Sequence, residues 1–159
     1  MNKAFGIWID GKLSDFNKRC IDSVAEKTDY VLLENPEPPR NELLFHLWNK
    51  GNVKRKSDII RYLYASEHAP IWYADTDVNL LSMPITNDKP MFADCGTYRD
   101  GFLFFSGANG EVCLNLLMAA ADTILSLMNL GLPFKSWWIV KQLAKMNVET
   151  ISRSCFYHG

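Results

Sequence analysis

The sequence predicts an α/β fold built around a parallel βαβ unit. Segments typical of strands and of helices mix along all 159 residues, which is the pattern of this fold class. The chain opens as strand, helix and strand, an order that favours a parallel crossover. The most apolar strand, at 71–74, is followed directly by two aspartates. Because ligands bind at the carboxyl ends of strands in open α/β sheets, any active site is expected there.

The opening βαβ unit consists of three short segments. The apolar run 5–9 ends at Asp10-Gly11, which is typical of a strand followed by a turn. Ser14 can then cap a helix, because its hydroxyl can accept a bond from a free backbone N–H of the first turn. A second strand is expected at 30–33. The apolar residues that mark one face of the helix recur every four positions: Phe16, Cys20 and Val24.

Two helices are expected between the second strand and the central strand 71–74. The segment 34–40 contains three prolines, so it is expected to be a loop that extends neither the strand before it nor the helix after it. A helix follows at 41–50, and Gly51 ends it. The next helix, at about 54–67, leads straight into the central strand.

The rest of the chain predicts three more strands and two helices. Strand-like runs lie at 91–94 and 102–105, and a glycine-containing turn precedes a long helix at about 111–130. Five polar residues interrupt the apolar stretch 112–134, so we interpret it as a core helix and not as a membrane span; an interfacial helix is the alternative. The last expected elements are a helix capped by Ser136 and a strand at 148–152.

Length and composition indicate one domain over residues 1–159. A chain of 18.2 kDa is large enough for a substantial core. The net charge of -1, with 22% charged residues, argues against a strongly basic nucleic-acid-binding protein. The four cysteines form no Cys-x-x-Cys pair, so zinc knuckles and thioredoxin-like motifs are not supported. Reduced thiols and an N-terminus without a signal-peptide core lead us to expect a cytoplasmic protein.

Two carboxylates, Asp75 and Asp77, follow the central strand. Paired hard oxygen ligands suit a divalent cation, although aspartate is also common in structural turns. Asp58 and Arg61 lie one helical turn apart and can face the same spot. Trp8 ends the first strand, where its ring could stack on a base or belong to the core. Together these residues predict a cradle for a nucleotide diphosphate.

The segment 56–64, followed by 71–78, resembles the sugar-binding region of glycosyltransferase family 32. The helix contributes Ser-Asp-x-x-Arg and the strand end contributes Asp-x-Asp. Residues 7–11 resemble the family's N-terminal strand, and residues 104–117 resemble its later strand, turn and helix. The similarity covers most of residues 5–125.

This resemblance implies a GT-A-like, Rossmann-like domain that binds a nucleotide sugar, with a mostly parallel sheet flanked by helices. The implied function is that of a metal-dependent retaining hexosyltransferase, as in polysaccharide biosynthesis. The donor would be a UDP- or GDP-sugar, and the acceptor a saccharide, a lipid-linked sugar or a protein. In the retaining reaction of the family, the acceptor hydroxyl attacks on the face from which the nucleotide leaves, and the donor phosphate takes its proton.

The resemblance also implies roles for the residues of the cradle. Asp75 and Asp77 match the residues that hold Mn²⁺ or Mg²⁺ against the donor diphosphate, and Asp75 is also expected to contact ribose or sugar hydroxyls. Asp58 and Arg61 match the pair that binds the transferred sugar and the phosphate. Trp8 matches the ring that stacks on the base.

Three further residues are weaker candidates. His158 corresponds to the additional metal ligand that family members often use near the C-terminus, or is a loose terminal residue. Asp94 and Asp100 are the nearest candidates for a catalytic base, if one acts. Two features depart from the family: Ala69-Pro70 replaces the usual Gly-Gly, and the chain is much shorter than most members.

Two other function classes stay open. A non-catalytic module that keeps the nucleotide-sugar pocket is compatible with the short chain. A phage-type sugar transferase acting on modified nucleic acid is disfavoured by the near-neutral charge, because binding a phosphate backbone needs several basic contacts.

Overall fold

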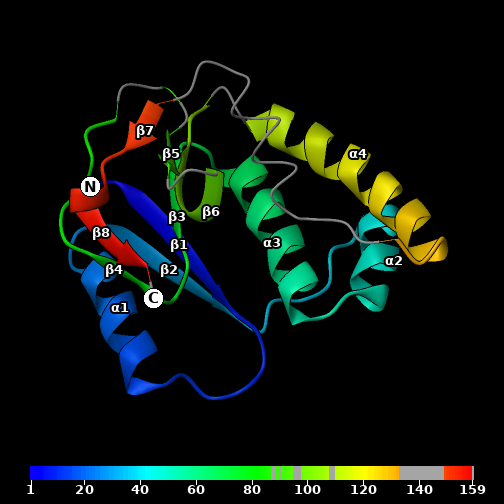
Figure 1. The fold of residues 1–159 in the computed structure, drawn as a ribbon, viewed down its shortest axis with the longest axis horizontal. Coiled ribbons are helices and arrows are strands. Elements are labelled where there is room, and N and C mark those ends of the chain that lie inside the picture. Colours follow the sequence, from blue (N-terminus) through cyan, green and yellow to red (C-terminus); the bar gives the residue numbers. More distant parts are fainter. Residues whose placement is uncertain (87–88, 90, 95–97, 108–109, 133–148, 159) are drawn as a thin grey trace.

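The computed structural model describes residues 1–159 except 87–88, 90, 95–97, 108–109, 133–148 and 159 (Figure 1). A central sheet has the strand order β2-β1-β3-β6-β5-β7, and β4 pairs with β8 in a second, smaller sheet. The central strands are β1 (Lys3–Trp8), β2 (Asp29–Glu34), β3 (Ile71–Ala74), β5 (Met91–Asp94), β6 (Tyr98–Phe105) and β7 (Glu149–Ile151). The other elements are α1 (Asp15–Ala25), α2 (Glu42–Lys50), α3 (Val53–His68), β4 (Val78–Leu80), α4 (Gly110–Asn129), a 3₁₀ turn (Arg153–Cys155) and β8 (Phe156–His158).

Five of the six central strands run in the same direction. β1 is parallel to β2 and β3, β5 is parallel to β7, and β6 is antiparallel to both β3 and β5. The predicted mostly parallel sheet is therefore confirmed. The carboxyl ends of β1, β2, β3 and β5 all lie at one edge, which we call the carboxyl edge.

Polar caps set the starts of the first three helices. The side chains of Ser14, Asn41 and Asn52 accept a backbone N–H three residues later, which satisfies a donor that the helix itself cannot pair. Because Asn52 is the cap, α3 begins one residue earlier than expected. Gly51 ends α2, as predicted.

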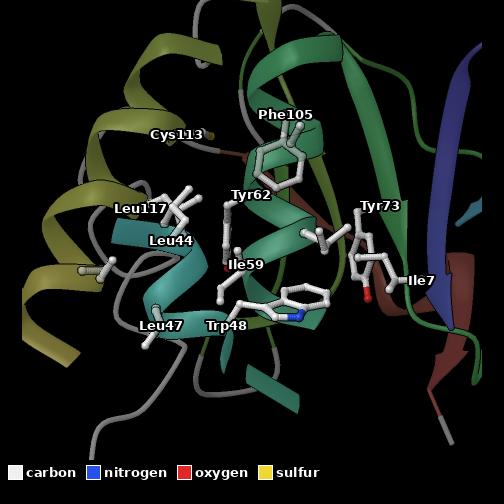
Figure 2. Close-up of a cluster of buried hydrophobic side chains, with 14 of the residues drawn as sticks. Ile7, Leu44, Leu47, Trp48, Ile59, Tyr62, Tyr73, Phe105, Cys113 and Leu117 are labelled. Carbon is white, nitrogen blue, oxygen red and sulfur yellow. The ribbon is translucent and has the colours of Figure 1, made fainter. Parts of the chain in front are cut away.

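Helices cover both faces of the sheet. α2, α3 and α4 lie on one face, and α1 with the β4–β8 pair lies on the other (Figure 1). Under the three helices, Leu44, Tyr62 and Phe105 belong to one apolar cluster (Figure 2). The opposite cluster includes Trp72 and Phe102. Side chains of β3 alternate between the two clusters, so its unbroken apolar sequence reflects burial on both faces.

Further features differ from the sequence predictions or lie beyond them, and β6 begins at Tyr98, four residues before the predicted strand 102–105. β4 and β8 were not predicted, because each has only three residues and its pairing comes from the far end of the chain. Phe16 is 46% exposed and does not join Cys20 and Val24 in the core, since a first-turn side chain points back beyond the end of its helix. The helix expected after Ser136 lies outside the described residues.

α4 is the single helix in the described part of the chain that is long and apolar enough, by length and composition, to cross a membrane. It packs against α3 and α2. Its residues Cys113, Leu117 and Ala121 are buried in the core. One face of α4 is therefore packed in the core, and the choice between a core helix and an interfacial helix stays a prediction.

Gly110 allows α4 to pass close to α3. A Cβ atom added at Gly110 would lie 2.9 Å from the backbone oxygen of Ser66, so Gly110→Ala is expected to lower the free energy of unfolding by about 1–3 kcal/mol. Gly107→Ala is the matched control, because its Cβ would meet only Pro70 Cδ at 3.7 Å; a change below about 0.5 kcal/mol is expected. Urea unfolding that gave both variants the same stability would contradict the close approach.

Candidate functional site

The two predicted carboxylates lie on a tight turn between β3 and β4, at the carboxyl edge. The Asp75 N–H donates to the Gly101 carbonyl at 2.7 Å, which ties the start of the turn to β6. The Val78 N–H donates to the Asp75 carbonyl at 3.0 Å and closes a β-turn around Thr76 and Asp77. Asp75 and Asp77 are both half-buried. The acidic turn, residues 75–78, therefore has its carboxylates where the sheet topology favours ligand binding.

Arg61 in α3 connects Asp58 to the acidic turn. Its Nη2 atom donates to the Tyr73 hydroxyl at 3.0 Å and lies 3.4 Å from Asp75 Oδ1. Its Nη1 atom lies 3.7 Å from Asp58 Oδ1. Its Cζ atom lies 4.2 Å from the centre of the Tyr73 ring. The structure thus brings together three of the predicted residues, and the two carboxylates balance a buried cation.

Tyr73 is a member of this site that the sequence prediction missed. Its hydroxyl donates to Asp75 Oδ1 at 2.5 Å while accepting from Arg61. Burial raises the pKa of Tyr73 well above its usual value, so the phenol stays protonated and holds one carboxylate oxygen in place. Strand alternation was the available signal, because residues 73 and 75 lie on the same side of an extended chain.

Tyr73→Phe is expected to reduce the loss of stability at alkaline pH. The raised folded-state pKa of Tyr73 means that its stabilising contribution is complete below the unfolded pKa of about 10 and is lost as the pH rises further. One such group adds a slope of about 1.4 kcal/mol per pH unit. Urea unfolding from pH 8 to 11 should show a shallower decline above pH 10 in the variant. Parallel declines in both proteins would contradict this.

Trp8 lies at the carboxyl edge, half-buried, and is not a fully buried core residue. Its indole Nε1–H donates to the Gly11 carbonyl at 3.0 Å, which folds the ring onto the loop after β1. Asp10 and Asn35 both have positive φ, 59° and 44°, and the Asp10 N–H donates to Asn35 Oδ1 at 2.9 Å. This hydrogen bond joins the loops after β1 and β2, and both residues are of the types that adopt the left-handed region most readily after glycine.

The backbone brings two weaker candidates towards the same edge. His158 in β8 lies opposite Val78, the residue after Asp77. Asp94 ends β5, two strands away from β3, which corresponds to about 10 Å across the sheet. The side chains of His158, Asp94 and Asp100 lie outside the described part of the structure, so their roles stay predictions.

The acidic turn offers carboxylate oxygens, which are the ligand type that hard divalent cations take. Among the described residues, no three His, Cys, Asp or Glu side chains gather in one place, so this part of the chain does not form a closed metal cage. Mg²⁺ sites typically use one or two carboxylates, with substrate phosphates and water as the other ligands. Asp75 and Asp77 are suited to an ion of that kind.

Comparison with known proteins gives a match at the level of the fold. No family model matches the sequence, and no curated protein is significantly similar to it. A glycosyltransferase involved in the glycosylation of the major capsid of PBCV-1 superposes with a TM-score of 0.50 and 11% identity, over 94% of this chain and 82% of that one. The glycosyltransferase GlyE of Streptococcus pneumoniae TIGR4 superposes with a TM-score of 0.54 and 7% identity, over 95% of this chain and 45% of that one.

The chain has a GT-A-type glycosyltransferase fold. This confirms the fold class predicted from the sequence. This chain corresponds to less than half of GlyE. The narrower resemblance to family 32 stays a prediction, because no family model matches.

Proposed function

We propose that the protein is a metal-dependent, retaining glycosyltransferase of the family 32 type. It transfers a hexose from a UDP- or GDP-sugar to a saccharide, a lipid-linked sugar or a protein. The observation that carries this proposal is the acidic turn at the carboxyl edge of a GT-A-type sheet, with Asp75 hydrogen-bonded to Tyr73 and Arg61.

The residues of the acidic turn would bind the donor through its diphosphate. Asp75 and Asp77 would hold Mn²⁺ or Mg²⁺, which when bound supplies positive charge to the departing nucleoside diphosphate. Tyr73 and Arg61 hold Asp75 in one orientation, so it need not reorganise when the donor arrives. Asp58, on the other side of Arg61, keeps the guanidinium in place.

The loops after β1 and β2 would receive the nucleoside. Trp8 offers a half-exposed ring there, and the Asp10–Asn35 hydrogen bond keeps the two loops together. In the transfer step, the bond from the anomeric carbon to the diphosphate oxygen breaks and a bond to the acceptor oxygen forms on the same face. The acceptor proton passes to the departing phosphate. Asp94 is the candidate base if a side chain takes that proton instead.

Thermal unfolding with nucleotide sugars tests this proposal. UDP-glucose, UDP-galactose, UDP-N-acetylglucosamine and GDP-mannose are each added with and without Mn²⁺. A donor at about a hundred times its Kd adds roughly 2.7 kcal/mol, which corresponds to a rise in Tm of about 5–10 °C for a domain of this size. The rise should require Mn²⁺ and disappear in the Asp75→Asn/Asp77→Asn double variant.

The outcomes separate the function classes. No shift with any donor would contradict a nucleotide-sugar site. A Mn²⁺-dependent shift without any slow hydrolysis of the same donor would favour the non-catalytic binding module.

A further inference from the structure

α1 makes a side-chain contact with the acidic turn. The Asn17 amide Nδ2 donates to the Thr76 carbonyl at 3.1 Å, across 59 positions in the sequence. The other end of the same amide, Oδ1, accepts from the Ser14 hydroxyl at 2.6 Å, and that hydroxyl also accepts the Asn17 backbone N–H at 3.1 Å. The helix cap therefore orients the amide that reaches the turn.

The carbonyl that Asn17 holds belongs to the central peptide of the turn. Type I and type II turns share the bond that closes the turn, here from the Val78 N–H to the Asp75 carbonyl, and differ by a flip of that central peptide. The type II form needs a positive φ at its third residue, Asp77. Among the described non-glycine residues, positive φ occurs at Asp10 and Asn35 and not at Asp77. A flip would reverse the Thr76 carbonyl and redirect the side chain of Asp77.

One further contact places α1 alongside the segment that follows. Burial raises the pKa of the Cys20 thiol, and the negative charge of Asp77 adds to this rise. The Leu80 N–H donates to Ser23 Oγ at 2.8 Å. Asn17, Cys20 and Ser23 are spaced three residues apart and form one stripe of the helix. The stripe follows the chain from the acidic turn into β4.

We propose that Asn17 is a positioning residue for the acidic turn. By holding the Thr76–Asp77 peptide in one orientation, it fixes the direction in which the Asp77 side chain leaves the turn, and so its position relative to Asp75. This role rests on the proposed function, because its consequence is the affinity for the cation that the donor diphosphate needs.

The test compares Asn17→Ala and Asn17→Asp with Ser23→Ala. Asn17→Asp keeps the size and the acceptor for Ser14 but loses the amide donor, and its added negative charge would by itself favour a cation. Ser23→Ala removes a similar contact between α1 and the backbone, but at Leu80, outside the turn. Electron paramagnetic resonance of Mn²⁺ titrated in the presence of UDP or GDP measures the affinity.

Both Asn17 variants should bind Mn²⁺ about tenfold more weakly than the wild type, whereas Ser23→Ala should stay within about twofold of it. The Tm values of Asn17→Ala and Ser23→Ala should fall by similar amounts, because each variant loses a hydrogen bond between an α1 side chain and the backbone of another segment. Equal Mn²⁺ affinities in Asn17→Ala and Ser23→Ala would overturn the positioning role.

A second readout does not need the metal. The three-bond HN–Hα coupling of Asp77, an NMR signal that depends on φ, should change in Asn17→Ala and keep its wild-type value in Ser23→Ala. If the wild type itself takes up no Mn²⁺ with either nucleotide, the proposed function fails, and this signal still decides the role of Asn17. An unchanged Asp77 signal in Asn17→Ala would show that the turn holds its shape alone.

Discussion

Replacing Arg61 with alanine is expected to lower the free energy of unfolding by about 3–5 kcal/mol. Arg61 and Asp58 are only 5% and 7% exposed, so the variant leaves a carboxylate without its cation where water has little access. Tyr73 also loses the guanidinium over its ring and the donor to its hydroxyl. Urea unfolding with a constant m-value measures the loss.

Two variants check the physical reason for this loss. Arg19→Ala removes an exposed arginine of α1 and should change stability by less than about 0.5 kcal/mol. Adding Asp58→Asn to Arg61→Ala should restore part of the lost stability, since a neutral amide needs no cation. If the double variant is less stable than Arg61→Ala, the buried Asp58 carboxylate is not the cause of the lost stability.

Asp77→Asn is expected to slow turnover of the donor by about 10²- to 10³-fold. The substitution keeps the shape of the side chain but removes the charge that would hold a divalent cation at the diphosphate. Hydrolysis of the nucleotide sugar that gives the largest thermal shift, with Mn²⁺ present, provides the rate without knowledge of the acceptor.

Asp22→Asn is the matched control for this rate. Asp22 lies on the exposed side of α1, so its variant should hydrolyse the donor at the wild-type rate. Tm values of both variants without ligand should lie close to that of the wild type, which would exclude a folding defect. Retention of more than about half the rate in Asp77→Asn would remove this carboxylate from the proposed site.

Local chemistry made much of the fold predictable. Ser14 begins α1 and Gly51 ends α2 as expected, because capping depends on residues within one turn of the helix end. β3 was predicted with its observed bounds, since four apolar residues in a row suit a strand buried on both faces. The same reasoning missed β4 and β8, which are too short to be read from a pattern and form only because their partners meet.

The candidate site divides in a similar way. Spacing and a family resemblance were enough to predict Asp75, Asp77, Asp58 and Arg61. Tyr73 was not predicted, because it was interpreted only as one of the apolar residues of a buried strand. No local sequence pattern predicted the hydrogen bond from Asn17 to Thr76.

By itself, the sequence determined the α/β class, the element that carries the acids and the helix that carries Asp58 and Arg61. These depend on periodicity, caps and short motifs, which act over a few residues. Only the tertiary structure decided which side chains hold the acidic turn. Tyr73 and Asp75 meet Arg61 because α3 packs on β3, and Asn17 meets Thr76 because α1 packs on the opposite face. Such contacts depend on how elements pack, and packing is a property of the whole chain.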